Sequence, residues 1–162
     1  MSTAFLFNND KILMMKRSAE RKLAPGVWTG IGGHIEPEEI NNPEIAIKRE
    51  IYEETGIENH RLSDLNLRYV LLRQKGNEIR EQFVYFGRTD QQQLVENDEG
   101  ELHWLDIESI HELDKPMIIE SMIEHYFKFG IDNEEIYVGL LTMTADNKAK
   151  MTFSAMRDPI VV

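Results

Sequence analysis

Three glutamates stand close together in the segment 49–57, whose sequence is REIYEETGI. On an α-helix, Glu50, Glu53 and Glu54 occupy positions i, i+3 and i+4, so their side chains share one face. Like charges at these spacings repel each other, and the C-terminal end of a helix further disfavours anions. Arg49 can pair with Glu53 but cannot neutralise all three carboxylates. The cluster is explained if a divalent cation lies among them, and hard oxygen ligands suit Mg²⁺ or Mn²⁺.

A solvated acidic helix face is the alternative interpretation, and it is the commoner reason for a run of charges on a helix. The residues on either side of the helix favour the cation site. Gly32 and Gly33 precede it, and adjacent glycines let a backbone approach a ligand closely. Glu39 lies in the loop before the helix, and Gly56 follows it.

Together these residues resemble the Nudix box of the Nudix hydrolase family. The box consists of glycine, five residues, glutamate, seven residues, Arg-Glu, an aliphatic residue, any residue, Glu-Glu, any residue, glycine and an aliphatic residue. The segment 33–57 matches it with Gly33, Glu39, Arg49, Glu50, Ile51, Glu53, Glu54, Gly56 and Ile57. Nine residues, not seven, separate Glu39 from Arg49, and we place the extra pair in the segment 40–42. The insertion leaves the helix register unchanged, but it could displace Glu39, the residue expected to stabilise the loop.

The resemblance implies a metal-dependent hydrolase, with Mg²⁺ or Mn²⁺ as cofactor, that cleaves a nucleoside diphosphate linked to another group. By position in the box, Glu53 and Glu54 would be the main metal ligands. Glu50 would be a ligand or a catalytic base, and the carbonyl of Gly32 a further ligand. Arg49 would orient the carboxylates through an ion pair.

Further site residues are expected outside the helix. A carboxylate from a later loop often assists Nudix catalysis as a ligand or base; Glu99 is the first candidate here and Glu101 the second, although either could be a solvated loop acid. The candidates for substrate binding are Lys16, Arg17, Trp28, Gly33 and Asp114. The alternative for Lys16 and Arg17 is that they are ordinary exposed cations at a strand end. Trp28 could instead pack under the loop, and Asp114 could serve only as an acid at the start of a helix.

The elements that position these residues follow from hydrophobic periodicity, with glycine, proline and polar turns between them. The helix with the three glutamates is expected over residues 44–54, opened by Pro43 and capped by Gly56. A second helix is expected over 116–130. The expected strands span residues 3–7, 11–16, 65–74, 79–89, 101–107, 134–144 and 148–156. This order predicts an α+β fold, a Nudix-type α/β/α sandwich with a mixed sheet, plus a C-terminal β-hairpin extension over about 131–157.

The length of 162 residues suits one domain, so with the resemblance it implies a single Nudix domain over residues 1–162. The formal net charge of −11 argues against nucleic-acid and membrane partners but permits a small nucleotide accompanied by a metal ion. The chain has no cysteine, which excludes disulfides, thiolate zinc sites and cysteine nucleophiles. The N-terminal apolar run lacks a basic flank and is too short for a secretory signal, so we expect a cytoplasmic protein.

Signatures of several family branches are missing, which leaves a small MutT-like enzyme as the main hypothesis. Its expected substrate is a (d)NTP such as 8-oxo-dGTP, cleaved to the monophosphate and pyrophosphate. The alternatives are an ADP-ribose or nucleotide-sugar pyrophosphatase, and a non-catalytic Nudix domain that senses a nucleotide. The C-terminal hairpin could close the domain's own sheet, or it could offer an exposed edge that makes a homodimer.

Overall fold

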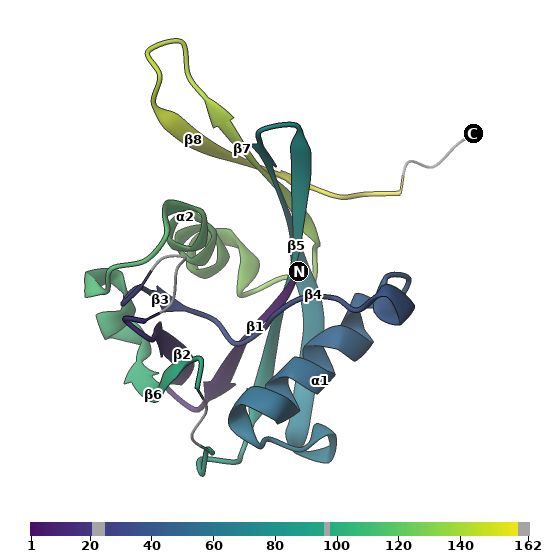
Figure 1. Ribbon diagram of the computed structural model, residues 1–162, viewed down its shortest axis with the longest axis vertical. Helices are drawn as coiled ribbons and strands as arrows, with labels where there is room; N and C mark the ends of the chain where they lie inside the picture. The colour runs from purple at the N-terminus through teal and green to yellow at the C-terminus, as the bar shows by residue number, and fades with distance from the viewer. Residues whose placement is uncertain (21–24, 96–97, 159–162) are drawn as a thin grey trace.

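A computed structural model describes residues 1–20, 25–95 and 98–158 as a mixed sheet with a helix on each face (Figure 1). The strands are β1 (Ser2–Asn8), β2 (Lys11–Arg17), β3 (Trp28–Thr29), β4 (Leu62–Lys75), β5 (Glu78–Thr89), β6 (Gly100–Asp106), β7 (Tyr137–Met143) and β8 (Ala149–Ala155). The helices are α1 (Pro43–Thr55) and α2 (Met117–His125), with 3₁₀ turns η1 (Pro37–Glu39), η2 (Asn59–Arg61) and η3 (Ile107–Glu112) and a π turn η4 (Tyr126–Gly130).

The strand order across the sheet is β3-β2-β1-β5-β4-β7-β8, and β6 pairs with β2 outside this path. Strands β1 and β5 are parallel, as are β4 and β7, whereas the hairpins β1–β2, β4–β5 and β7–β8 are antiparallel. The sheet is therefore mixed, as predicted. Its centre is β1, which begins beside β5 with Ser2 opposite Phe83.

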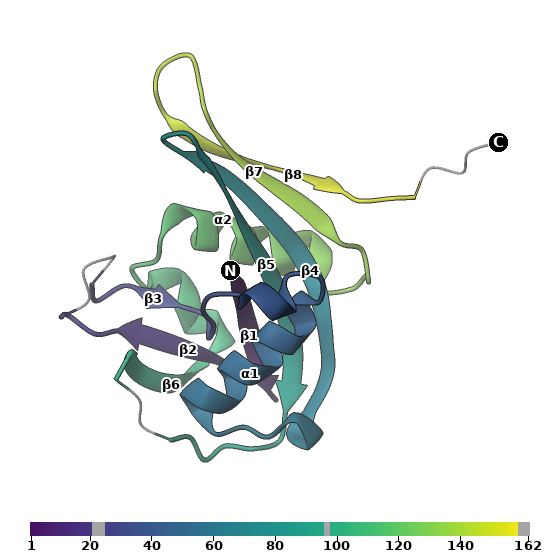
Figure 2. The same ribbon diagram turned by 45° about the vertical axis from the view of Figure 1, so that its right-hand side comes forward.

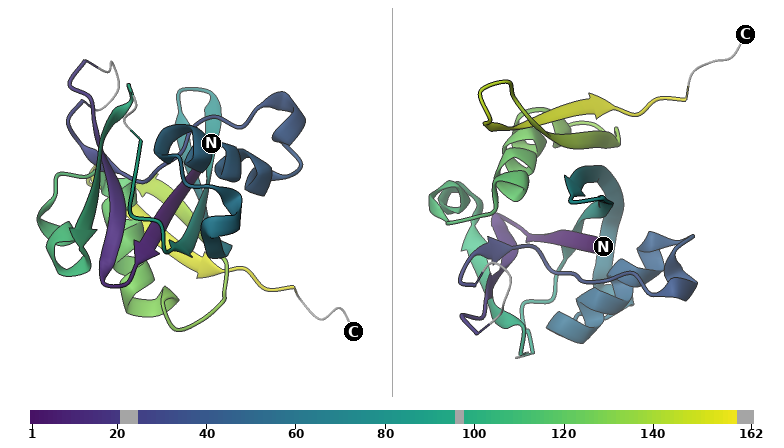
Figure 3. Two further views of the ribbon diagram at one scale, coloured as in Figure 1. Left: turned by 90° about the horizontal axis from the view of Figure 1, so that it is seen from below. Right: turned by 45° about the horizontal axis from the view of Figure 1, so that its top comes forward.

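Alternate residues of β1 face opposite helices, which explains why every residue of the strand is buried. Phe5 and Phe7 belong to the core cluster that includes α2, whereas Ala4 and Leu6 belong to the cluster that includes α1. Both faces of the sheet are thus covered, with α1 and α2 on opposite sides (Figure 3). The predicted α/β/α sandwich is confirmed.

The helix boundaries follow the expected local signals with one difference. Pro43 occupies the first helical position of α1, and Gly56 ends it with φ 71° while its N–H donates to the Tyr52 carbonyl. The second helix is shorter than the expected 116–130, because α2 ends at His125 and the chain continues to Gly130 as a π turn. None of the helices in the described part of the chain combines the length and apolar character needed to span a membrane.

The C-terminal hairpin continues the domain's own sheet. Strand β7 runs parallel to β4, with Tyr69 opposite Tyr137, and Phe153 of β8 packs against the core cluster on the α2 side. Of the two expected roles, the hairpin fulfils the first by extending this sheet: β7 lies between β4 and β8, and among the described strands the outer edge on this side is β8. The tips of the β4–β5 and β7–β8 hairpins extend together beyond the helices (Figure 2).

Candidate active site

The loop before α1 is fixed on the start of β1. The Ser2 N–H donates to the Gly33 carbonyl at 3.0 Å, and Gly32 has φ 145°, a conformation that side chains other than glycine rarely adopt. A Cβ atom at Gly32 would lie 2.2 Å from the Ser2 carbonyl oxygen. Only glycine therefore allows the loop to lie this close to the strand, and Gly32 is explained by packing as well as by ligand access.

Glu50 points from α1 at this loop. A Cβ atom added to Gly33 would lie 2.6 Å from Glu50 Oε1 and 2.7 Å from Oε2, so the carboxylate rests directly against the Gly33 backbone. The carboxylate is largely buried, and burial raises its pKa. The hydrogen bond from Arg49 opposes this shift, while the charges of Glu53 and Glu99 add to it.

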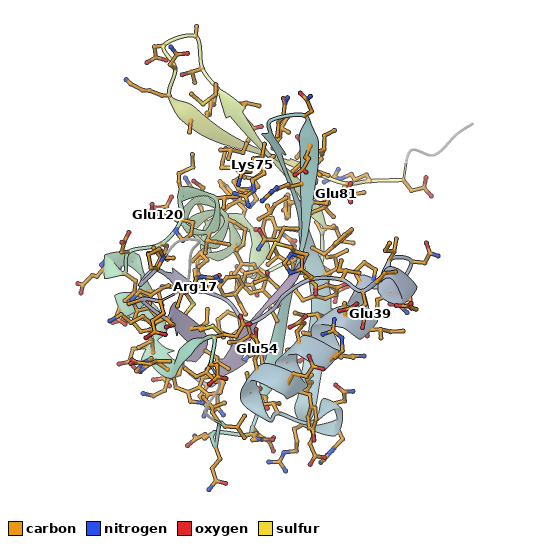
Figure 4. The ribbon with its side chains drawn as sticks, viewed as in Figure 1. Arg17, Glu39, Glu54, Lys75, Glu81 and Glu120 are labelled. Atoms are coloured by element: carbon orange, nitrogen blue, oxygen red, sulfur yellow. The ribbon has the colours of Figure 1, made fainter. Side chains whose placement is uncertain are left out.

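Glu54 is the most deeply buried of the three helix glutamates, with 6% of its surface exposed. Its Oε2 accepts a hydrogen bond from the Gly32 N–H at 3.0 Å. Burial raises the pKa of Glu54 to about 8, the charges of Glu99 and Glu50 act in the same direction, and the charge of Arg17 opposes them. In Figure 4, Glu54 projects from α1 toward the centre of the molecule, where Arg17 approaches from β2.

Arg49 holds the loop and the helix carboxylates together. Its Nε and Nη2 atoms donate to Oε1 and Oε2 of Glu39, each at 2.9 Å, and Nη2 also donates to the His34 carbonyl at 3.0 Å. Its Nη1 donates to Glu50 Oε1 at 2.9 Å and to Glu53 Oε2 at 3.0 Å. The guanidinium fork thus contacts three carboxylates and one carbonyl, a geometry that a lysine could not reproduce.

Glu39 reaches this position in spite of the two-residue insertion. The hydrogen bond from Arg49 lowers the pKa of Glu39 to about 2, and Glu39 Oε2 also accepts from the Glu36 N–H at 2.9 Å. Residues 40–42 form the turn between η1 and α1, so the insertion is accommodated there. Figure 4 shows Glu39 in the loop beside α1, facing the helix.

The three helix glutamates share one face only in part. Adjacent residues of a helix point about 100° apart, and Glu54 is buried whereas the Glu53 side chain is 55% exposed and bonded to Arg49. Glu99 lies near enough to Glu50 and Glu54 to raise the pKa of both. Glu101 is exposed on β6, with its carboxylate 3.3 Å from His103 Nε2, so its contact is with His103 and not with the helix carboxylates.

The chemistry of these residues fits a hard divalent cation. Glu50, Glu54 and Glu99 crowd negative charge beside the Gly32–Gly33 backbone. A cation would offset their mutual repulsion, which adds to the effect of burial in raising the pKa of Glu50 and Glu54. Within residues 1–20, 25–95 and 98–158, no three acidic, histidine or cysteine side chains converge closely enough to form a complete ligand set by themselves. Glu50 and Glu54, assisted by Glu99, are the residues that could hold the ion, with backbone, water or phosphate oxygens completing its shell.

The remaining predicted substrate residues lie around β2, β3 and the start of α2. Lys16 is exposed and Arg17 half-buried at the end of β2. Trp28 packs against the core cluster of the α2 side, with its ring 5.3 Å from that of His103. The backbone N–H of Trp28 donates to the Asp114 carbonyl at 2.9 Å. The Asp114 side chain is exposed and does not cap α2, whose N-cap residue is Pro116.

Comparisons with known proteins agree with this geometry. The family profile described as NUDIX domain matches residues 2–126. The mutator MutT protein from Bacillus halodurans is 18% identical with a TM-score of 0.67, covering 98% of this chain and 97% of its own. A C. elegans Ap4A hydrolase binary complex is 15% identical with a TM-score of 0.63, covering 82% of this chain and 96% of its own.

The NUDIX domain of Shewanella oneidensis NrtR, solved with ADP ribose, is 15% identical with a TM-score of 0.59, covering 78% of this chain and 83% of its own. At these identities the structural likeness establishes the shared fold. No curated protein sequence matches the chain.

Proposed function

Because the chain belongs to the Nudix hydrolase family, we propose that it hydrolyses the pyrophosphate bond of a (d)NTP such as 8-oxo-dGTP, giving the monophosphate and pyrophosphate. The observation that carries the proposal is the position of Glu50 and Glu54, two largely buried carboxylates directed at the Gly32–Gly33 loop. Glu50 accepts a hydrogen bond from Arg49, and Glu54 accepts one from the Gly32 N–H. A likeness to MutT proteins supports the substrate class.

Mg²⁺ is the cofactor that the donor set suits best, with Mn²⁺ as the alternative. When bound, such a cation neutralises the polyphosphate, polarises its phosphoryl oxygens and lowers the pKa of the attacking water. Glu50, which lies against the Gly33 backbone and whose pKa is raised by burial, is the first candidate base, and Glu99 is the second. Arg49 keeps Glu50 oriented, while Lys16 and Arg17 contribute positive charge at the end of β2.

Substrate recognition falls to the groups around this centre. The Gly33 backbone lies against the Glu50 carboxylate and defines one wall of the space for a phosphate. Trp28 and Asp114 are linked by a hydrogen bond between their backbones, and we propose that they contact the nucleoside part of the substrate. The proposed roles of Glu53 and Glu101 are those of outer ligands that reach the cation only in the loaded enzyme.

ADP-ribose, or a related nucleotide sugar, is the second candidate substrate. The likeness to the NrtR domain solved with ADP ribose favours it over other diphosphates. Both candidates use the same carboxylates, so they are distinguished by products and not by site geometry.

Product analysis tests the proposal, with Glu53→Gln as the loss-of-function variant. Its matched control is Glu44→Gln, the same substitution on the same helix at an exposed residue paired with Lys48. Purified proteins are assayed with dGTP, 8-oxo-dGTP, ADP-ribose and diadenosine polyphosphates in Mg²⁺ and in Mn²⁺. Pyrophosphate and monophosphate released by wild type and Glu44→Gln, but not by Glu53→Gln, support the triphosphate assignment.

Other products redirect the assignment. Release of AMP and ribose phosphate would identify the enzyme as an ADP-ribose pyrophosphatase. If no substrate is hydrolysed but nucleotides bind in the presence of metal, the protein would instead be a non-catalytic Nudix domain that senses a nucleotide.

The chain is further proposed to act in the cytoplasm and to form a homodimer. Among the described strands β8 pairs only with β7, so its outer edge can accept a strand from a second copy. Ending the chain after Gly130 should then reduce the mass measured by sedimentation to that of one monomer. An unchanged sedimentation mass would refute pairing through this hairpin.

A further inference from the structure

A cavity of about 320 Å³ lies where the α2 face of the sheet meets the loop that contains Gly33 and His34. Its apolar wall is formed by Leu71 of β4 and Ile118 of α2. The rest of the lining comprises Met1, His34, Arg73, Arg80, Glu81 and Gln82, so it holds one acidic residue beside the two arginines. This volume lies at the lower end of the range for small-ligand pockets. None of the roles proposed for the Nudix-box residues involves these two arginines.

The strand register explains why the arginines converge. Leu71 of β4 and Val84 of β5 are buried in the cluster on the α2 side. Side chains alternate along a strand, so Arg73 and Arg80 project from the same face of the sheet as these two residues. They are also direct partners across the β4–β5 ladder, and such pairs have Cβ atoms about 5 Å apart.

This placement is unfavourable in the protein alone. Like charges directly opposite each other destabilise a sheet, and both arginines are half-buried. Arg80 has a partner in Glu78 at 3.2 Å, an exposed acid. In the described part of the chain the Arg73 side chain has no hydrogen bond or ion pair. An anion between the two guanidinium groups would offset the repulsion, and the planar fork of arginine binds phosphate oxygens well.

The cavity adjoins the proposed catalytic centre. His34 lines it, and the preceding residue, Gly33, lies against the Glu50 carboxylate. The His34 carbonyl is held by Arg49 at 3.0 Å, so the segment between the two sites is fixed. Gln82 is fixed as well, because its Nε2 donates to Thr3 Oγ1 at 2.9 Å. A nucleotide cleaved beside Glu50 can therefore place its remote end in the cavity.

We infer that Arg73 and Arg80 form an anion subsite that selects nucleotides with a second phosphoryl group remote from the bond that is cleaved. The inference rests on the proposed function for the position of the first phosphates. Within the proposed substrate class it predicts a preference for nucleotides that carry phosphate on the ribose or on the linked group, in addition to the diphosphate that is hydrolysed.

The experiment compares substrates that differ only in the remote phosphate. One pair is GTP and guanosine 5′-triphosphate 3′-diphosphate, and the other is ADP-ribose and its 2′-phosphate. The value of kcat/KM is measured for both members with wild type, the double variant Arg73→Gln/Arg80→Gln and the double variant Arg73→Lys/Arg80→Lys. The control is Arg88→Gln, the same substitution at an exposed position toward the other end of β5.

Wild type and Arg88→Gln are expected to prefer the phosphorylated member of at least one pair by about tenfold or more, since each charge-assisted contact contributes on that order. The glutamine double variant should lose this preference, and the lysine double variant should retain part of it. Equal kcat/KM for both members of both pairs in wild type would overturn the inference, as would a preference that survives in the glutamine variant.

Binding of the same four compounds by calorimetry separates this inference from the proposed function. If wild type hydrolyses none of them, the hydrolase assignment fails. The subsite is still supported if the phosphorylated members bind about tenfold more tightly than the plain ones and lose that advantage in the glutamine variant. If binding shows no such difference, the subsite is refuted whether or not hydrolysis occurs. Circular dichroism and the melting temperature establish that the variants are folded.

Discussion

Gly33→Ala is the substitution that most directly probes the proposed centre. Gly33 does not have a positive φ, so its backbone conformation accepts an alanine. The added methyl group would meet the carboxylate of Glu50 at 2.6 Å, whereas contacts of this kind become ordinary at 3.4 Å. The carboxylate must therefore retreat by about 0.8 Å, the difference between these two distances.

A displacement of this size has different consequences for catalysis and for stability. Misplacing a catalytic group by about 1 Å can cost on the order of 100-fold in rate. The atom that moves is the end of a flexible side chain, and replacing glycine by alanine also restricts the unfolded chain. We therefore expect kcat to fall about 100-fold while the free energy of unfolding changes by less than about 1 kcal/mol.

The assay pairs steady-state kinetics on the best substrate with urea denaturation. Gly32→Ala is the informative comparison, because its methyl group would meet the Ser2 carbonyl oxygen at 2.2 Å and its φ is 145°. That variant should lose stability as well as activity. Wild-type kcat in Gly33→Ala would refute the placement of Glu50 in the reaction. A loss of stability equal to that of Gly32→Ala would show that the Glu50 carboxylate cannot move as argued.

Three further predictions concern stability. Without metal, the free energy of unfolding should fall as pH rises from about 4.5 to about 8, by at most about 1.4 kcal/mol per pH unit, because the folded state retains the Glu54 proton that the unfolded state releases. A series of denaturation curves at different pH values measures this slope. If the slope persists in Glu54→Gln, it belongs to another group. Ile51→Ala, at a fully buried position of α1, should cost about 2–5 kcal/mol by urea denaturation, and a smaller cost would show that the site collapses around the cavity. Ending the chain after Gly130 should lower the melting temperature, because Tyr137 and Phe153 then leave the core cluster; an unchanged value would show that the hairpin unfolds independently.

Local signals were sufficient to predict most of the fold. The α1 helix begins at Pro43 and is capped by Gly56. The positive φ of Gly56 is a conformation that glycine favours, so the residue type alone indicates the end of the helix. The hairpins follow from alternating apolar runs with polar turns between them. The π turn after His125 was not predicted, because its sequence continues the apolar spacing of the helix. A change of hydrogen-bond pattern leaves no mark in that spacing.

The site required information that only tertiary structure supplies. The spacing of Glu53 and Arg49 predicts their ion pair, and the structure has it. The stronger bidentate contact of Arg49 with Glu39 spans ten residues and an insertion, so it depends on where the loop folds back. The opposed arginines, Arg73 and Arg80, could be found only from the register of the β4–β5 ladder.

Parallel pairing gives the chain a particular order of assembly during synthesis. Strand β1 is made first, but its partner β5 follows only after some eighty residues, with Ser2 opposite Phe83. Strand β4 must likewise wait for β7, with Tyr69 opposite Tyr137. Loop closure over such separations is slow, and a nascent chain exposes apolar strands until it is complete. The core cluster on the α2 side is therefore complete only after β8 has left the ribosome, and chaperones have their main opportunity to bind before that moment.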